Sequence, residues 1–153
     1  MDCSLKIPFE ELQNKLIEIS RQNPKLRSSK KREYILKALY DSQKHLTPEE
    51  LYSIVKREYE PEIGLATVYR SLIFFEDFGL VNSIALKDGI KRYEINCDQL
   101  HDHIICTECG RIDEFHRDEI DEILQDVAKS KGYIYSSKSV KAFGICPDCQ
   151  AKS

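Results

Sequence analysis

The sequence predicts an α+β fold in two parts, and three observations support that prediction. Within the first 95 residues, four stretches with the apolar spacing of helices come before two strand-like stretches. From residue 101 onward, short strand-like stretches flank one further helix. Two Cys-x-x-Cys pairs occur, and both lie in this second part. We therefore expect one domain over 1–95, a hinge over 96–100 and a smaller domain over 101–153.

The first two helices are indicated by apolar residues that recur every three or four positions. One such stretch covers 8–22 and ends at Asn23-Pro24, because proline disfavours a helical residue before it. The next runs from about 29 to 40, and Ser28 or Ser29 is placed to cap its first turn. Both stretches are amphipathic, so each helix should pack one face against a core.

The third and fourth helices carry clearer start and stop signals. Thr47-Pro48-Glu49-Glu50 offers a capping residue, a proline suited to the first helical position and a carboxylate that completes a capping box. The fourth helix is expected over about 66–78, and Gly79 is placed to end it, because glycine readily adopts the left-handed conformation that follows many helices.

A β-hairpin is predicted after the fourth helix. Residues 80–86 and 90–95 have strand patterns, and Asp88-Gly89 between them is a turn signal. Short helices followed by a hairpin are the order of a winged helix-turn-helix domain, in which the last helix enters the DNA major groove and the hairpin is the wing. The first part is therefore expected to bind DNA, with the 8–22 helix as an N-terminal extension.

The second part should be a small α/β domain. Short strands are expected at 103–106 and 111–115, followed by a helix over about 118–131 and a final strand near 133–144. A unit of roughly 50 residues has little room for an apolar core, so its stability should depend on a further link.

Paired cysteines can supply that link. The ligand set of a tetrahedral structural zinc site is completed by the sulfurs of Cys106, Cys109, Cys146 and Cys149. The 36 residues from 110 to 145 separate the two pairs, so most of the domain lies between the halves of the site. Two pairs together favour zinc, but Cys-x-x-Cys is also a dithiol redox motif. Cys3 and Cys97 lack such partners and are interpreted as incidental.

Composition and charge narrow the class of protein. The chain has 153 residues, of which 41% are apolar and 32% charged, as in ordinary globular proteins. It has no apolar stretch of about 18 residues and no signal-peptide pattern, so a cytoplasmic location is expected. The net charge is −3, yet residues 21–44 hold 8 basic against 2 acidic side chains. That excess suits phosphate, and a solvated helix face would show the same pattern.

A second metal site is indicated by histidines. His101 and His103 lie two apart in a predicted strand, so both imidazoles face the same side. His45 precedes the third helix, Glu94 lies at the end of the hairpin, and Glu114 follows the first cysteine pair. Imidazole and carboxylate ligands together suit Fe²⁺, Mn²⁺, Co²⁺ or Zn²⁺. Spacing supports the His101/His103 pair alone, since a single histidine at a helix start is more often a cap or a surface residue.

Three motifs resemble the ferric uptake regulator family. They are His45-Leu46-Thr47-Pro48-Glu49-Glu50, then Gly64-Leu65-Ala66-Thr67-Val68-Tyr69-Arg70-Ser71-Leu72, and finally His101-Asp102-His103-Ile104-Ile105-Cys106-Thr107-Glu108-Cys109-Gly110 with Glu114-Phe115 after it. The similarity covers about residues 25–150 in matching order. It implies a homodimeric repressor that binds palindromic, AT-rich operators in double-stranded DNA when it is loaded with metal.

The resemblance also implies which residues act. Structural zinc would be held by the four paired cysteines. The regulatory metal, Fe²⁺ or another divalent ion, would be held by His45, Glu94, His101, His103 and Glu114. DNA would be contacted by Arg27, Ser29, Arg32, Thr67, Tyr69 and Arg70.

Two departures from the family pattern refine this expectation. Many members hold a further metal with residues that correspond here to Leu100, Asp102, Asp121 and Lys138. Two of these four are not ligands, so that site is predicted to be absent. Peroxide-sensing relatives usually have aspartate where this chain has Glu94 and Glu114, which makes the iron-sensing branch the closer one.

Other functions remain as alternatives. A zinc-sensing or peroxide-sensing member of the family would carry similar ligands. A thiol or metal enzyme is a different class, but the sequence has no evident nucleophile–base pair, and we expect no enzymatic activity. A zinc-ribbon module that binds proteins would not need the winged-helix pattern or the basic segment at 21–44.

Overall fold

The structure is a computed structural model that describes residues 7–25, 29–96 and 101–152. The chain divides into two compact units, one on either side of residues 97–100. Most of the hinge predicted over 96–100 therefore lies outside the described residues. None of the helices in the described residues is long and apolar enough to cross a membrane.

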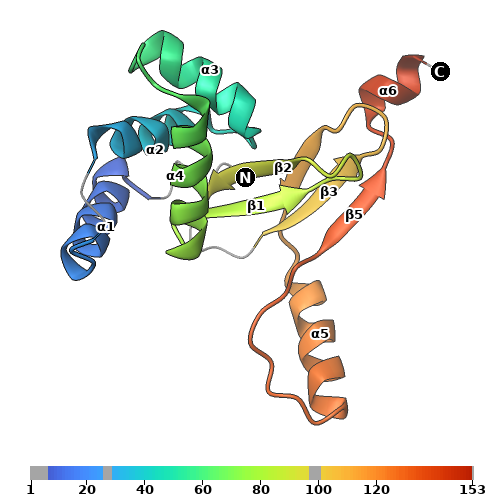
Figure 1. Cartoon of the computed structure of the whole chain (residues 1–153). Helices are drawn as coiled ribbons and strands as arrows, with labels where there is room; N and C mark the ends of the chain where they lie inside the picture. Colours follow the sequence, from blue (N-terminus) through green and yellow to red (C-terminus); the bar gives the residue numbers. More distant parts are fainter. Residues whose placement is uncertain (1–6, 26–28, 97–100, 153) are drawn as a thin grey trace. The chain divides into compact units, whose positions relative to one another are not determined.

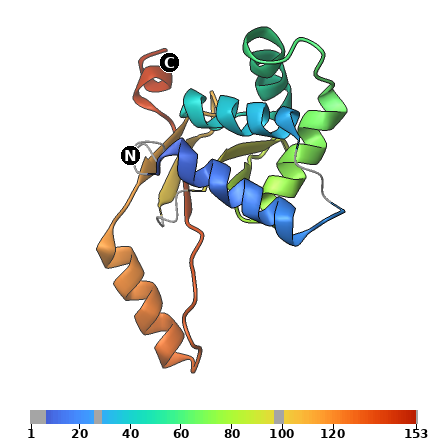
Figure 2. The ribbon, with the colours of Figure 1, turned by 90° about the vertical axis from the view of Figure 1, so that its left-hand side faces the viewer.

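The N-terminal unit consists of four helices and a β-hairpin (Figures 1 and 2). Its elements are α1 (Phe9–Gln22), α2 (Lys30–Ser42), α3 (Pro48–Glu58), α4 (Leu65–Asp77), β1 (Val81–Ala85) and β2 (Lys91–Ile95). The predicted order of helices and strands in this part of the chain is confirmed. It is the order of a winged helix-turn-helix domain, in which α4 occupies the position of the recognition helix and β1–β2 that of the wing.

An apolar core holds these helices together. Each helix contributes side chains that are fully or almost fully buried, among them Leu12, Ile35, Leu39, Leu51, Val55, Leu72 and Phe75. Complete burial of a side chain of this size contributes about 1.5–3 kcal/mol. Because the buried face of α4 is fixed in this core, its opposite face is held toward solvent, where Tyr69 is 40% exposed.

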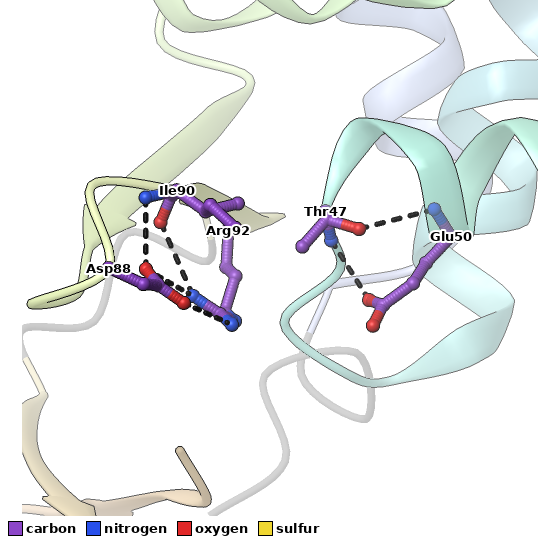
Figure 3. A network of polar contacts seen from close by, with 5 residues as sticks. All are labelled: Thr47, Glu50, Asp88, Ile90 and Arg92. Carbon is purple, nitrogen blue, oxygen red and sulfur yellow. Dashed lines mark hydrogen bonds and ion pairs between the residues drawn. The ribbon is translucent and has the colours of Figure 1, made fainter. Parts of the chain in front are cut away.

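The start of α3 follows the predicted capping box (Figure 3). The Glu50 amide donates to Thr47 Oγ1 at 3.2 Å, and the Thr47 amide donates to Glu50 Oε2 at 3.0 Å. The prediction for α2 was only partly right. Ser29 is its N-cap residue, but its side chain makes no capping hydrogen bond with the described residues, and Ser28 lies outside them.

The hairpin turn is fastened by one aspartate (Figure 3). Asp88 Oδ1 accepts from the Ile90 amide at 2.9 Å, and Asp88 Oδ2 lies 3.1 Å from Arg92 Nη2. Both contacts lower the pKa of Asp88, and the contact with Arg92 has the larger effect. Gly89 has a φ of 76°, which explains why glycine follows the aspartate. The turn fixes the antiparallel register in which Asn82 faces Glu94.

The C-terminal unit is a three-stranded sheet with two helices. Its elements are β3 (Asp102–Cys106), β4 (Ile112–Phe115), α5 (Asp118–Ser130), β5 (Lys141–Gly144) and α6 (Pro147–Lys152). The strand order is β4-β3-β5, with β3 antiparallel to β4 and parallel to β5. In both ribbon views α5 extends away from this sheet, and the extended segment after it runs back alongside the helix to the sheet (Figures 1 and 2).

One prediction for this unit was wrong, and one element was missed. The final strand begins at Lys141, not near residue 133, since residues 133–140, all of them described, form no strand. The side chains of that segment are mostly exposed, and Ile134 is 97% exposed. Sequence analysis also missed α6, which begins at Pro147, a residue suited to the first position of a helix.

The C-terminal unit has much less apolar core than the N-terminal unit. None of the α5 residues, all of which the structure describes, is buried. Ile123 and Val127 on this helix are 61% and 46% exposed, and Phe143 on β5 is 49% exposed. Among the described residues of this unit, Ile105 and Cys106 are the buried apolar ones.

Candidate metal centres and DNA-reading helix

The four paired cysteines meet at one edge of the C-terminal sheet. Parallel pairing places Cys106, at the end of β3, opposite Gly144, at the end of β5. The turn after β3 carries Cys109, Cys146 directly precedes α6, and Cys149 lies in the first turn of α6. As a result, the four sulfurs all lie within 4.8 Å of one another.

The geometry of the cluster fits a tetrahedral metal ion. Cys109 Sγ and Cys146 Sγ are 3.8 Å apart. Two sulfurs bound to one zinc ion at about 2.3 Å with tetrahedral angles would be about 3.8 Å apart. A disulfide would need about 2.05 Å, and all four cysteines are free thiols. The arrangement therefore favours metal binding over a dithiol pair that cycles through a disulfide.

Electrostatics of the cluster favour a cation at its centre. Backbone amides donate hydrogen bonds to Cys106 and lower its pKa to about 6. The largest effect comes from the Cys146 amide, which donates to Cys106 Sγ at 3.3 Å. Hydrogen bonds with neighbouring sulfurs, first that of Cys146, raise the pKa of Cys149 to about 12, because thiolates held together repel one another. A divalent cation would relieve that repulsion and let all four sulfurs bind as thiolates.

A pair of candidate ligands lies within the N-terminal unit. His45 Nε2 is 2.7 Å from Glu94 Oε2. Their proximity depends on a strand pairing that sequence analysis did not predict: Leu46 and Tyr93 form an antiparallel bridge, with hydrogen bonds of 3.0 and 2.8 Å. Because His45 and Glu94 are the next residues on each side, the bridge brings an imidazole and a carboxylate together.

Three more candidate ligands lie within the C-terminal unit. His103 on β3 faces Glu114 on β4 in the antiparallel register. His101 Nε2 is 3.6 Å from Glu114 Oε1, and the His101 and His103 rings are 4.8 Å apart. The five ligands expected from the resemblance thus form two groups, each built within one unit from imidazole and carboxylate. Such mixed groups suit divalent first-row metals.

The predicted DNA contacts on α4 lie on its exposed side. Tyr69 and Arg70 are exposed, and Arg70 Nη2 lies 3.5 Å from Thr67 Oγ1. Core packing is therefore not the role of Tyr69. On α2, the Arg32 guanidinium lies 4.3 Å from the centre of the Phe74 ring, which ties it to α4. Arg27 falls outside the described residues, as do Cys3 and Cys97.

Comparison with known proteins assigns the family. The sequence profile of the ferric uptake regulator family matches residues 23–143. The chain belongs to this family. As a ferric uptake regulator family member, it is a metal-responsive, DNA-binding transcriptional regulator and not an enzyme. The resemblance inferred from the three motifs is confirmed.

Individual members of the ferric uptake regulator family match most of the chain. The ferric uptake regulation protein of Campylobacter jejuni is 37% identical over 144 residues, which cover 94% of this chain and 91% of the relative. The peroxide-responsive repressor PerR of Staphylococcus saprophyticus is 30% identical, with 99% and 100% covered. The Helicobacter pylori ferric uptake regulator, described as having three functional metal-binding sites, matches with a TM-score of 0.87 and 32% identity, covering 95% of each chain.

Several polar contacts in this ferric uptake regulator family member escaped sequence analysis. The Tyr69 hydroxyl donates a hydrogen bond to the Glu49 carboxylate, although the two are 20 residues apart. His116, Asp118 and Asp121 offer ligand atoms within 4.8 Å of one another at the start of α5. Their close spacing in sequence could have indicated a metal-binding group. However, His116 and Asp118 are exposed, and exposed acidic groups often occur without a metal.

Proposed function

We propose that this chain is a repressor that senses ferrous iron and controls genes of metal homeostasis. The observation that carries the proposal is the pair of half-sites: His45 with Glu94 in the DNA-binding unit, and the His101, His103 and Glu114 group in the C-terminal unit. The first half offers two ligands and the second offers three, so an ion bound by both halves would gain a set of five imidazole and carboxylate ligands.

Closure of the two halves on one ion gives the switch. A ligand that binds better to one arrangement of the units shifts the population toward it. The ligands of the half-sites belong to different units, so their common use of an ion restricts the orientation of the DNA-binding unit. Linkage then requires that operator DNA tighten metal binding by the same factor by which metal tightens DNA binding.

The cysteine cluster has a separate, structural role in this proposal. Its four thiolates would hold Zn²⁺ permanently, which suits a small unit with few buried apolar residues. The sulfur–sulfur distance and the all-thiolate donor set support zinc. The imidazole and carboxylate donors of the half-sites bind metal less firmly, as a sensor must, and ferrous iron is the ion that we assign to them.

DNA binding would use two kinds of contact. Tyr69 and Arg70, with Thr67 beside them, present polar groups on the exposed face of α4 and would touch base edges in the major groove. Ser29 and Arg32 at the start of α2, together with Arg27, would contact the DNA backbone or the minor groove. We propose a palindromic, AT-rich operator bound by a homodimer in the cytoplasm.

The exposed apolar side chains of the C-terminal unit support the homodimer. Ile123, Val127 and Phe143 would otherwise remain in water, and obligate interfaces are rich in such groups. Two chains related by a twofold axis would present two α4 helices to successive faces of a palindromic duplex.

A zinc-sensing or peroxide-sensing regulator is the second candidate. The match to a peroxide-responsive repressor over nearly the whole chain favours the latter. Oxidation by peroxide would act on histidines that bind iron, so the two candidates make different predictions. After treatment of the iron-loaded protein with hydrogen peroxide, an iron sensor regains DNA binding on renewed addition of Fe²⁺ and reductant. A peroxide sensor with oxidised histidine ligands does not.

Fluorescence anisotropy tests the proposal. Protein that retains its thiolate-bound zinc is titrated into an AT-rich palindromic duplex without oxygen, first with a chelator and then with Fe²⁺, Mn²⁺ or Zn²⁺ at fixed salt. The proposal expects tight DNA binding only with added metal. It also expects Fe²⁺ to induce that binding at a free concentration within the range found in cells. Binding of equal strength with chelator and with each metal would contradict it.

A further inference from the structure

A buried lysine joins two carboxylates in the C-terminal unit. The Lys138 side chain is 3% exposed, and its Nζ lies 2.9 Å from Asp102 Oδ2 and 2.8 Å from Asp121 Oδ1. Asp102 is on β3, Asp121 is in the first turn of α5, and Lys138 lies in the segment that leads to β5. The distances are those of charge-assisted hydrogen bonds, which are the stronger kind.

The surroundings of Lys138 resemble a cation site. Asp102 is 1% exposed, and its Oδ1 is buried without a hydrogen-bond partner among the described residues. His116 Nε2 lies 4.0 Å from the second oxygen of Asp121. Two carboxylates held close together repel each other unless a positive charge lies between them. A divalent metal ion commonly supplies that charge in proteins, and here an ammonium supplies it.

We propose that Lys138 is a built-in cation that takes the place of a metal ion between Asp102 and Asp121 and fastens the base of α5 to β3 whatever the metal supply. Burial alone would lower the pKa of Lys138, but the hydrogen bonds with Asp121 and Asp102 outweigh it and raise the pKa, so the ammonium stays charged. Many family members hold a further metal ion at this position, and this chain lacks two of its four ligands. In our proposal the Lys138 ammonium occupies the place of that ion.

Fastening at this point matters because α5 has little else to hold it. All α5 residues are described and none is fully buried, so packing within this chain holds the base of the helix only weakly. Asp102 lies between His101 and His103 in sequence and, by strand alternation, on the opposite face of β3. A fixed Asp102 therefore helps to hold the two imidazoles in register with Glu114. Lys138 is a positioning residue for that group.

This proposal deepens the proposed function and rests on it in one respect: the His101, His103 and Glu114 group is left as the metal-responsive one. The α5–β3 link would be the same with and without regulatory metal. One ion per chain, besides the thiolate-bound zinc, would then control DNA binding.

The first test replaces Lys138 with a metal ligand and asks whether the protein then binds one more metal ion. In a His101→Ala background, which weakens the regulatory site, zinc-retaining protein is titrated with Co²⁺ without oxygen and followed by its d–d absorption. With Lys138 present we expect no Co²⁺ at Asp102 and Asp121. When Lys138→His is combined with His101→Ala, the protein should gain one new Co²⁺ site per chain. A further Asp121→Asn substitution should remove that site. The matched control Lys131→His, at an exposed lysine, should create none.

Two results of this titration would overturn the proposal. One is Co²⁺ binding that needs Asp121 while Lys138 is still present, and the other is no new site in the Lys138→His protein. Because the background already lacks His101, neither result depends on a working regulatory site. Failure of the proposed function would instead appear as DNA binding that ignores metal in the unaltered protein.

Hydrogen exchange tests the link between α5 and β3. In zinc-loaded protein, Lys138→Met should speed exchange of amides 122–126 in α5 by about tenfold or more, because opening of the helix base loses its main restraint. Lys138→Arg, which keeps the positive charge, should exchange near the unaltered rate, as should the control Lys131→Met. Equal effects of the Met and Arg variants, including loss of folding in both, would show that the charge is not what fastens the helix and would overturn the proposal.

Discussion

The two units of this chain are stabilised by different forces. In the N-terminal unit, side chains from all four helices and the hairpin form one apolar core around residues such as Phe75 and Leu51. In the described part of the C-terminal unit, buried apolar side chains are few, and the close contacts are those of sulfurs and charges. The first unit should therefore fold on its own, whereas the second should depend on the zinc ion and the second copy of the chain that we propose for it.

That difference suits the two tasks of a metal-responsive regulator. A DNA-binding unit must keep the same recognition surface in all states, and a packed core achieves this because interiors resist deformation. A sensing unit must respond to an ion, and a unit with a small core is one in which bound ions contribute a large share of the stability. The contrast between the units leads to predictions of graded size.

The largest expected effect comes from loss of the zinc ion that we propose for the cysteine cluster. Cys146→Ser should unfold the C-terminal unit, because structural zinc contributes on the order of 10 kcal/mol of binding free energy to such a fold. Amide exchange would show lost protection in residues 101–152 and retained protection in the core of the N-terminal unit. Uniform loss of protection in both units would show that the first unit does not fold independently.

A core substitution should produce the converse pattern. Phe75→Ala should destabilise the N-terminal unit by about 3–5 kcal/mol, because it removes a fully buried aromatic ring. Chemical denaturation measures this loss, and thiol titration should show that the cysteine cluster still holds its zinc. Phe78→Ala is the matched control at the C-cap of the same helix, where the residue is 41% exposed, and should cost much less. Equal losses in the two variants would contradict the described core.

A smaller effect is expected at the start of α3. Thr47→Ala removes one of the two hydrogen bonds of the capping box and should cost about 1 kcal/mol. Thr47→Ser keeps the oxygen and should retain most of the stability. Thermal unfolding of the zinc-loaded protein would compare the two, and an alanine variant as stable as the serine variant would mean that the cap adds nothing.

The smallest effect concerns phosphate binding by α2. Arg32→Ala should reduce the slope of log binding constant against log salt concentration by about one, as expected for one lost phosphate contact. Anisotropy at several salt concentrations gives the slope. An unchanged slope with lower stability would instead assign Arg32 to packing against Phe74, which its position over that ring also supports.

The same contrast explains what the sequence could predict. The helices and hairpin of the first unit follow local signals such as the Thr47 capping box and the Asp88-Gly89 turn, and these were predicted. The cysteine cluster was also predicted, because thiolate spacing is specific. Residues 133–140 have a strand-like pattern, but whether a strand forms depends on a neighbour with which it can pair, and this information is not local.

Some contacts between distant residues, unlike those of the cysteine cluster, could not be read from local sequence patterns. His45 and Glu94 meet because Leu46 pairs with Tyr93, and no periodicity indicates that bridge. Lys138 was noted as a departure from a ligand pattern, but its ion pairs with Asp102 and Asp121 became evident only in the fold. In each case a charged or polar side chain is positioned by elements far apart in sequence.

The central claim is that one metal ion is bound jointly by ligands of both units, and two matched variants test it directly. His45→Ala removes a ligand of the DNA-binding unit, and His101→Ala removes one of the C-terminal unit. DNA binding by zinc-retaining protein is measured by anisotropy with chelator and with Fe²⁺. We predict that each variant loses most of the metal response, which in such switches is typically about 5- to 150-fold, while DNA binding with chelator stays unchanged. A full metal response in either variant would contradict joint binding.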